Sequence, residues 1–110
     1  MGEAWKKSFR AAAARAEVDA YFRNCLRLLD DRRLDEAEHR LSRSRWRSAV
    51  DLAAVPGTIV ELTDGLCADA VGLIEYGNVD AIRRVITQIL SMWRVAGPWT
   101  PASAFDQATP

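Results

Sequence analysis

The fold is decided by a stretch near the end of the chain, which runs Gly77-Asn78-Val79-Asp80-Ala81-Ile82-Arg83-Arg84, continues through Met92-Trp93-Arg94-Val95-Ala96, and closes at Gly97-Pro98-Trp99. Asn78 is a good helix N-cap, and Gly97-Pro98 is a strong helix stop. Apolar residues recur between these signals at the three- and four-residue spacing of one helix face: Val79, Ile82, Val85, Ile86, Ile89, Leu90, Trp93 and Ala96. The pattern predicts a helix that packs against other helices along one side.

The first part of the chain predicts a long helix over residues 3 to about 30, ended by a turn at 30–33. Its apolar stripe begins with five residues rich in alanine, Trp5, Phe9, Ala12, Ala13 and Ala16, and continues as Val18, Phe22, Cys25, Leu26 and Leu29. The alanine run at 11–14 favours helix and allows a neighbouring helix to approach closely.

A short helix is predicted over 34–41, followed by a separate helix over 43–55. Position 45 is Arg where the apolar stripe of the short helix should continue, and Ser42 can cap a new helix. The inner face of the second helix is predicted to consist of Trp46, Ala49, Val50 and Ala53. One kinked helix across 34–55 is the alternative.

Pro56-Gly57 ends that helix, and Thr58 can cap the next one, predicted over about 59–76. This helix is apolar around most of its circumference, which is typical of a central helix covered on two sides. Gly65, Ala68 and Gly72 form a strip of small residues along it. The strip predicts that the backbone of another helix passes close by, and tolerated instability near a loop is the alternative.

Together these segments predict an all-α fold, a single-domain bundle of four main helices with an additional short helix over residues 1–98. Residues 99–110 are rich in Pro, Ala, Ser and Thr and are expected to form a flexible tail. The chain has 110 residues with 49% apolar and 27% charged side chains, which is typical of one globular domain. No apolar signal segment or membrane-spanning run is present, so we expect a cytoplasmic protein with no membrane partner.

The sequence contains no complete catalytic or metal-binding pattern, and we expect a non-enzymatic protein without cofactor or metal. Glu36 and the single histidine, His39, make half of a di-iron carboxylate motif, and the other half is missing. Cys25 and Cys67 are predicted to be small core residues, and a bridge between them is left open. A small all-helical enzyme is one alternative function.

The strongest charge feature is the run His39-Arg40-Leu41-Ser42-Arg43-Ser44-Arg45-Trp46-Arg47, which has four arginines and no acidic residue. Trp and Arg dominate the energetic centres of protein interfaces. The candidate partner-binding residues are therefore Arg43, Arg45, Trp46, Arg47 and Trp99. The expected partner is another protein or a second copy of this chain. Weak nucleic-acid binding or regulation through Arg40–Arg47 is the alternative, although the formal net charge of the chain is zero.

Three segments resemble one known family: Leu41-Ser42-Arg43-Ser44-Arg45-Trp46, Gly77-Asn78-Val79-Asp80-Ala81-Ile82-Arg83, and Ala96-Gly97-Pro98. Residues 41–99 are similar to the CATRA-associated small proteins, helical proteins encoded with caspase-like and repeat-containing components of bacterial conflict systems. The resemblance implies a non-catalytic accessory protein that binds a larger defence protein. The matching positions are Arg45, Trp46, Gly97 and Pro98.

Overall fold

The structure, a computed structural model, describes residues 2–50, 52 and 55–96, with the side chains of 2–8, 43–44 and 96 outside the description. It contains α1 (Gly2–Asp30), α2 (Leu34–Leu41), the 3-10 helix η1 (Arg43–Ala49), α3 (Gly57–Ile74) and α4 (Val79–Ala96). Strands are absent from these described residues, and the predicted all-α class is confirmed.

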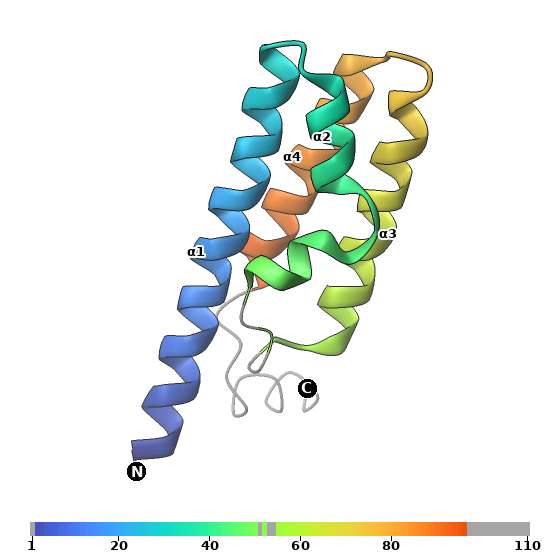
Figure 1. The fold of residues 1–110 in the computed structure, drawn as a ribbon. Helices are drawn as coiled ribbons and strands as arrows, with labels where there is room; N and C mark the ends of the chain where they lie inside the picture. Colours follow the sequence, from blue (N-terminus) through green and yellow to red (C-terminus); the bar gives the residue numbers. More distant parts are fainter. Residues whose placement is uncertain (1, 51, 53–54, 97–110) are drawn as a thin grey trace.

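The three long helices form a layer in which α4 lies between α1 and α3, and α2 and η1 cover one side of it (Figure 1). Helix α4 contacts both α1 and α3, whereas α3 contacts α4, α2 and η1. Helix α3 is therefore covered by neighbours on two sides, as predicted for a central helix. Its apolar circumference is not fully covered, because Leu62 is 56% exposed.

The small-residue strip of α3 faces outward, so the predicted close approach of another helix there was wrong. Gly65 and Gly72 are exposed, and a Cβ atom built on either one would have no neighbour within 4 Å. Helix α3 also begins earlier than expected, because Pro56 rather than Thr58 occupies the N-cap position. The Pro56 carbonyl accepts the Val60 N–H at 3.3 Å, which makes it the first acceptor of the helix.

The apolar face of α1 follows a different register from the predicted one in its first half. Ala11 and Ala14 are buried, whereas Ala12 and Ala16 are exposed and Phe9 is 67% exposed. Alanines of equal size carry little information on register, so the large residues further along decide which side of the helix is buried. Continued backward at helical spacing, the buried row of Val18, Phe22, Cys25 and Leu29 passes through Ala14 and Ala11.

Two helices end at residues whose backbone φ angle is positive, in the left-handed conformation. At the end of α1, the Arg33 N–H donates to the Leu28 carbonyl at 2.8 Å, and the Arg32 N–H donates to the Leu29 carbonyl at 3.1 Å. This pair of bonds is a Schellman motif, in which Arg32, at φ 61°, stands where glycine is preferred. The end of α3 uses Gly77, at φ 64°.

The helix predicted from the Asn78 cap through Val79 to Ala96 is confirmed as α4 (Val79–Ala96). The Ala81 N–H donates to Asn78 Oδ1 at 3.1 Å, so Asn78 is the predicted N-cap. The predicted inner row is buried at Ile82, Ile86, Ile89, Leu90 and Trp93, and it forms one side of a single core cluster with α1, α2, η1 and α3.

The segment after α2 differs from the predicted helix over 43–55. Ser42 is extended, which separates α2 from η1 and excludes the single kinked helix, and η1 ends at Ala49. Trp46 and Val50 are buried as expected, but Ala49 is exposed and Ala53 lies outside the described residues. Among the described residues of this segment, Trp46 and Val50 are buried and Leu52 and Val55 are partly buried. Their spacing does not form the continuous stripe that holds an α-helix against its neighbours.

Candidate functional site

The predicted partner-binding residues around η1 take different places in the structure. Trp46 has no exposed surface, so its predicted role as a surface contact is corrected to that of a core residue. Arg47 forms an ion pair with Asp64 of α3, and Arg45 is exposed and forms no ion pair within the described part of the chain. The side chain of Arg43 and all of Trp99 lie outside the described residues.

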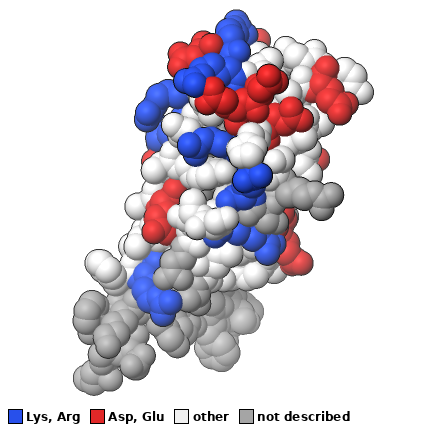
Figure 2. All heavy atoms as spheres, viewed as in Figure 1, with Lys and Arg blue, Asp and Glu red and all other residues white. Residues whose placement is uncertain are grey.

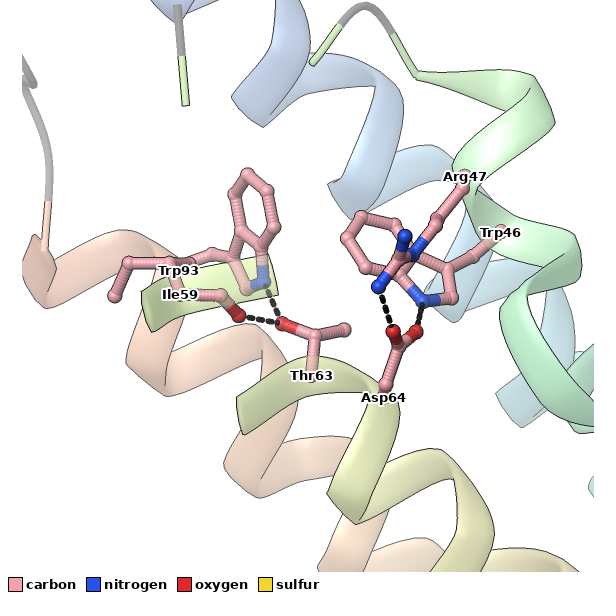
Figure 3. A network of polar contacts seen from close by, with 6 residues as sticks. All are labelled: Trp46, Arg47, Ile59, Thr63, Asp64 and Trp93. Carbon is pink, nitrogen blue, oxygen red and sulfur yellow. Dashed lines mark hydrogen bonds and ion pairs between the residues drawn. The ribbon is translucent and has the colours of Figure 1, made fainter. Parts of the chain in front are cut away.

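Trp46 is buried because α3 offers a partner for its only polar atom. Its Nε1–H donates to Asp64 Oδ1 at 2.6 Å, while Arg47 holds the second carboxylate oxygen (Figure 3). The ring packs edge-on against Trp93, with centroids 5.7 Å apart, and lies 6.3 Å from the ring of Phe22. A buried indole gains a large apolar contact area once its N–H is satisfied. The Asp64 carboxylate thus attaches η1 to α3.

A second polar pair lies beside the first, one residue earlier on α3, on its buried side (Figure 3). The Trp93 Nε1–H of α4 donates to Thr63 Oγ1 at 2.8 Å, and the Thr63 hydroxyl donates to the Ile59 carbonyl at 2.7 Å. Thr63 is fully buried. Consecutive residues Thr63 and Asp64 therefore each bind one tryptophan, and the two tryptophans meet between them. This arrangement connects α3 to both η1 and α4.

Charges on the η1 side of the molecule are mixed. Figure 2 shows basic and acidic side chains interspersed over the face that carries α2 and η1. Arg40 lies over the Tyr21 ring at 5.5 Å, and the Tyr21 hydroxyl donates to the Arg40 carbonyl at 2.7 Å. Two of the four arginines of the basic run, Arg40 and Arg47, are therefore already engaged within the fold.

A hollow that the sequence did not predict lies between α1 and α4. It encloses about 300 Å³, and its lining is formed by Ala12, Arg15, Ala16, Val18 and Asp19 of α1 with Leu90, Trp93 and Arg94 of α4. We call it the α1–α4 groove. The exposed Ala12 and Ala16 leave room where larger side chains would fill the space between the helices.

The α1–α4 groove combines an apolar floor with positive charge at its rim. Asp19 is its only acidic lining residue, and that carboxylate is paired with Arg23 at 2.7 Å. Arg15 and Arg94 form no ion pair within the described residues. Neither guanidinium group therefore has a carboxylate partner in the described part of the chain, and arginine forks match carboxylates well.

The groove could have been inferred from the sequence only with the correct register of α1. The predicted stripe placed Ala12 and Ala16 in the core, whereas the structure places them on the surface with Arg15. One wall of the groove is formed by Trp93, which is 2% exposed and donates a hydrogen bond to Thr63. The polar pair of Thr63 and Trp93 therefore positions one wall of the groove.

The two thiols lie in the core and are not candidates for nucleophilic chemistry. Cys25 and Cys67 are buried free cysteines. Burial raises the pKa of Cys25 to about 11, and burial together with the Asp64 charge raises the pKa of Cys67 to about 12. Both side chains are therefore neutral thiols near neutral pH.

The described part of the chain contains neither a cluster of metal ligands nor a membrane-spanning helix. Within it, no three His, Cys, Asp or Glu side chains cluster closely enough to hold a metal ion. Among the described helices, none has both the length and the apolar character needed to cross a membrane. Comparison of the chain with known protein families, with curated proteins and with solved structures finds no match.

Proposed function

We propose that this protein is a non-enzymatic helical interaction module whose α1–α4 groove binds an acidic, amphipathic segment of a partner protein. The observation that carries the proposal is the pairing of an apolar floor with two arginines that have no ion pair among the described residues, Arg15 and Arg94. An apolar side chain of the partner would fill the hollow, and carboxylates beside it would meet the guanidinium groups.

The size of the groove fits a segment of a protein. A hollow of about 300 Å³ is at the small end of ligand sites, large enough for one or two apolar side chains. Because it is open along two helices, neighbouring residues of an extended or helical segment can continue past it. This geometry supports helix-in-groove recognition, in which a few apolar anchors carry most of the binding energy.

The resemblance to CATRA-associated small proteins is consistent with this role, and we propose that the partner is a larger effector of a bacterial conflict system. Among the family's matching positions, Arg45 is exposed, so it is available as an additional contact. Trp46 acts indirectly, by fixing η1 on α3. Trp99 stays a predicted contact residue.

The proposal is tested with two synthetic amphipathic peptides of equal length and identical apolar residues, one carrying glutamates and the other lysines beside the apolar face. Binding is measured by fluorescence anisotropy at low and at physiological salt. We expect the acidic peptide to bind and the basic one not to bind. The double variant Arg15→Gln, Arg94→Gln should weaken binding at least about tenfold, because it removes two charge-assisted contacts.

The matched control is Arg27→Gln, which removes an exposed arginine of α1 that does not line the groove. It should leave peptide affinity within about twofold of the wild type, since a distant exposed charge is largely screened. Equal binding of both peptides, or an equal loss in the control, would show that the groove does not select acidic segments.

Nucleic-acid binding through Arg40–Arg47 predicts a different result. A salt-sensitive interaction with a DNA duplex that is lost in Arg45→Gln but unaffected by the groove variants would favour that alternative. The engagement of Arg40 and Arg47 within the fold leaves fewer free charges for phosphates than the sequence alone indicates.

A further inference from the structure

The outer face of the α3–α4 hairpin carries a row of incompletely buried apolar side chains. On α3 these are Ile59, Leu62, Leu66 and Leu73, and on α4 they are Val85, Met92 and Val95. Leu62 is 56% exposed and Val95 is 82% exposed. The α3 residues follow the three- and four-residue alternation of a helix–helix seam. We call this set the hairpin face.

Contacts within the fold place the hairpin face on the side away from α1 and η1. Asp64 on one flank of α3 binds η1, and helical spacing puts the row of Leu62 and Leu66 on the opposite flank. Likewise Arg94 lines the α1–α4 groove, and helical spacing puts Met92 on the other flank of α4. The two rows therefore border the same side of the α3–α4 contact, and they are separate from the groove.

We propose that the hairpin face binds the same face of a second copy of this chain, so that two α3–α4 hairpins form a four-helix bundle. The twofold axis runs parallel to the helices, which sets α3 of one copy antiparallel to α4 of the other. The two rows would then form the centre of the bundle, where half-buried apolar side chains become fully buried.

Charge complementarity selects this pairing. Helix α3 exposes two carboxylates, Glu61 and Asp69, and contains no Lys or Arg. Helix α4 exposes Arg84, which forms no ion pair within the described residues. Setting α3 against α3 would oppose like charges, whereas setting α3 against α4 brings acidic and basic groups together.

The heights of the residues along the axes of α3 and α4 agree with the pairing of α3 of one copy with α4 of the other. Trp93 binds Thr63, so these two residues lie at one level of the hairpin. Because both helices rise about 1.5 Å per residue, Val95 lies within about 2 Å of the level of Leu62, and Arg84 lies within one turn of Asp69. The twofold axis preserves levels. It therefore brings the exposed Leu62 of one copy to the exposed Val95 of the other, and Asp69 to Arg84.

The area of the hairpin face determines the expected affinity of the dimer. Two helices of 18 residues each, about 27 Å long and packed about 9 Å apart, offer a face of about 500 Å² per copy. The total of about 1,000 Å² is at the lower limit for a specific interface, so we expect a dimer with a micromolar Kd.

Sedimentation velocity of the full chain over a concentration series, about 1 to 200 μM, spans the expected Kd. The wild type should reach twice the 12.2 kDa mass of the chain at the high end. Leu62→Glu should raise the Kd at least about 100-fold, because each copy would bury a charge at the centre of the bundle. Phe9→Glu is the matched control, an exposed large apolar residue on α1 whose replacement should not change the Kd.

A charge exchange tests the orientation of the two copies. Asp69→Arg alone should weaken the dimer about tenfold, and adding Arg84→Asp should restore the Kd to within about threefold of the wild type. Circular dichroism checks that each variant is folded. A wild type that stays monomeric throughout the series, or a Leu62→Glu variant that dimerises normally, overturns the proposal. A dimer that the charge exchange weakens further overturns the α3-to-α4 orientation. The groove variants should dimerise normally, so failure of the groove proposal and failure of this one are distinguishable.

Discussion

The sharpest test of the packing is at Thr63, the one buried polar side chain among the described residues. Its hydroxyl accepts the Trp93 Nε1–H at 2.8 Å and donates to the Ile59 carbonyl at 2.7 Å. Thr63→Val keeps nearly the same shape and replaces the hydroxyl by a methyl group. Thr63→Ser keeps the hydroxyl and removes the methyl group. The two variants therefore separate the hydrogen bond from the apolar packing.

Thr63→Val removes the hydroxyl that accepts the buried Trp93 Nε1–H, and the loss of this bond costs about 1–3 kcal/mol of the free energy of unfolding. The Ile59 carbonyl lies inside α3 and retains its backbone partner, so the lost donation adds little. The new methyl group offsets part of the loss, by up to about 0.8 kcal/mol. We expect Thr63→Val to destabilise the fold by about 1.5–2 kcal/mol and Thr63→Ser by about 0.8 kcal/mol.

Urea unfolding monitored by circular dichroism measures both values, and the melting temperature of Thr63→Val should fall by roughly 6–10 °C. A third variant, Trp93→Phe, removes the donor. Combined with Thr63→Val in a double-mutant cycle, it should show a coupling of at least about 1 kcal/mol, since the two residues share one bond. The reasoning is refuted if Thr63→Val is as stable as the wild type, or if Thr63→Ser is the less stable of the two.

Three further predictions use other features of the fold. Arg32→Gly should stabilise the protein by about 0.5–1 kcal/mol in urea unfolding, because glycine adopts the positive φ of this position without steric cost. Ala14→Leu should lower the melting temperature through overpacking that costs about 1–3 kcal/mol, whereas Ala20→Leu on the exposed side of α1 should change stability by less than about 0.5 kcal/mol. The raised pKa of Cys25 and Cys67 implies stability that is complete below about pH 9 and decreases as the pH rises toward 11. At pH 10 the two thiols together should lower the free energy of unfolding by about 3 kcal/mol, and Cys25→Ala, Cys67→Ala should show a smaller loss between pH 7 and 10.

The fold class and the two helices α3 and α4 were predictable because their signals are local. The Asn78 cap, the spacing of Ile82, Ile86 and Ile89, and the break at Pro56-Gly57 all act within a few residues. Signals of this kind predict where a helix begins and ends without information on the helix that it packs against. The register of α1 over its alanines was not predictable, because side chains of equal size do not indicate which side a neighbour will cover.

Trp46 shows why the candidate site was harder to predict than the fold. Its arginine neighbours favour an exposed surface, yet its burial depends on Asp64, 18 residues later in the chain and on another helix. The decisive information was the position of one carboxylate relative to an indole N–H, which no pattern around Trp46 contains. A tryptophan in a basic run is therefore ambiguous until the acceptor of its N–H is known.

Trp46 is connected to the proposed site through its contact with Trp93. Once Trp46 is part of the core, its ring supports Trp93 edge-on, and Trp93 in turn forms a wall of the α1–α4 groove. The basic run near η1 then affects binding through the position of that wall rather than through direct contact. Trp46→Phe tests this: it keeps an aromatic ring but removes the Asp64 bond. It should weaken binding of the acidic peptide while both groove arginines stay in place. An unchanged affinity in a destabilised but folded variant would show that the groove does not depend on the tryptophan pair.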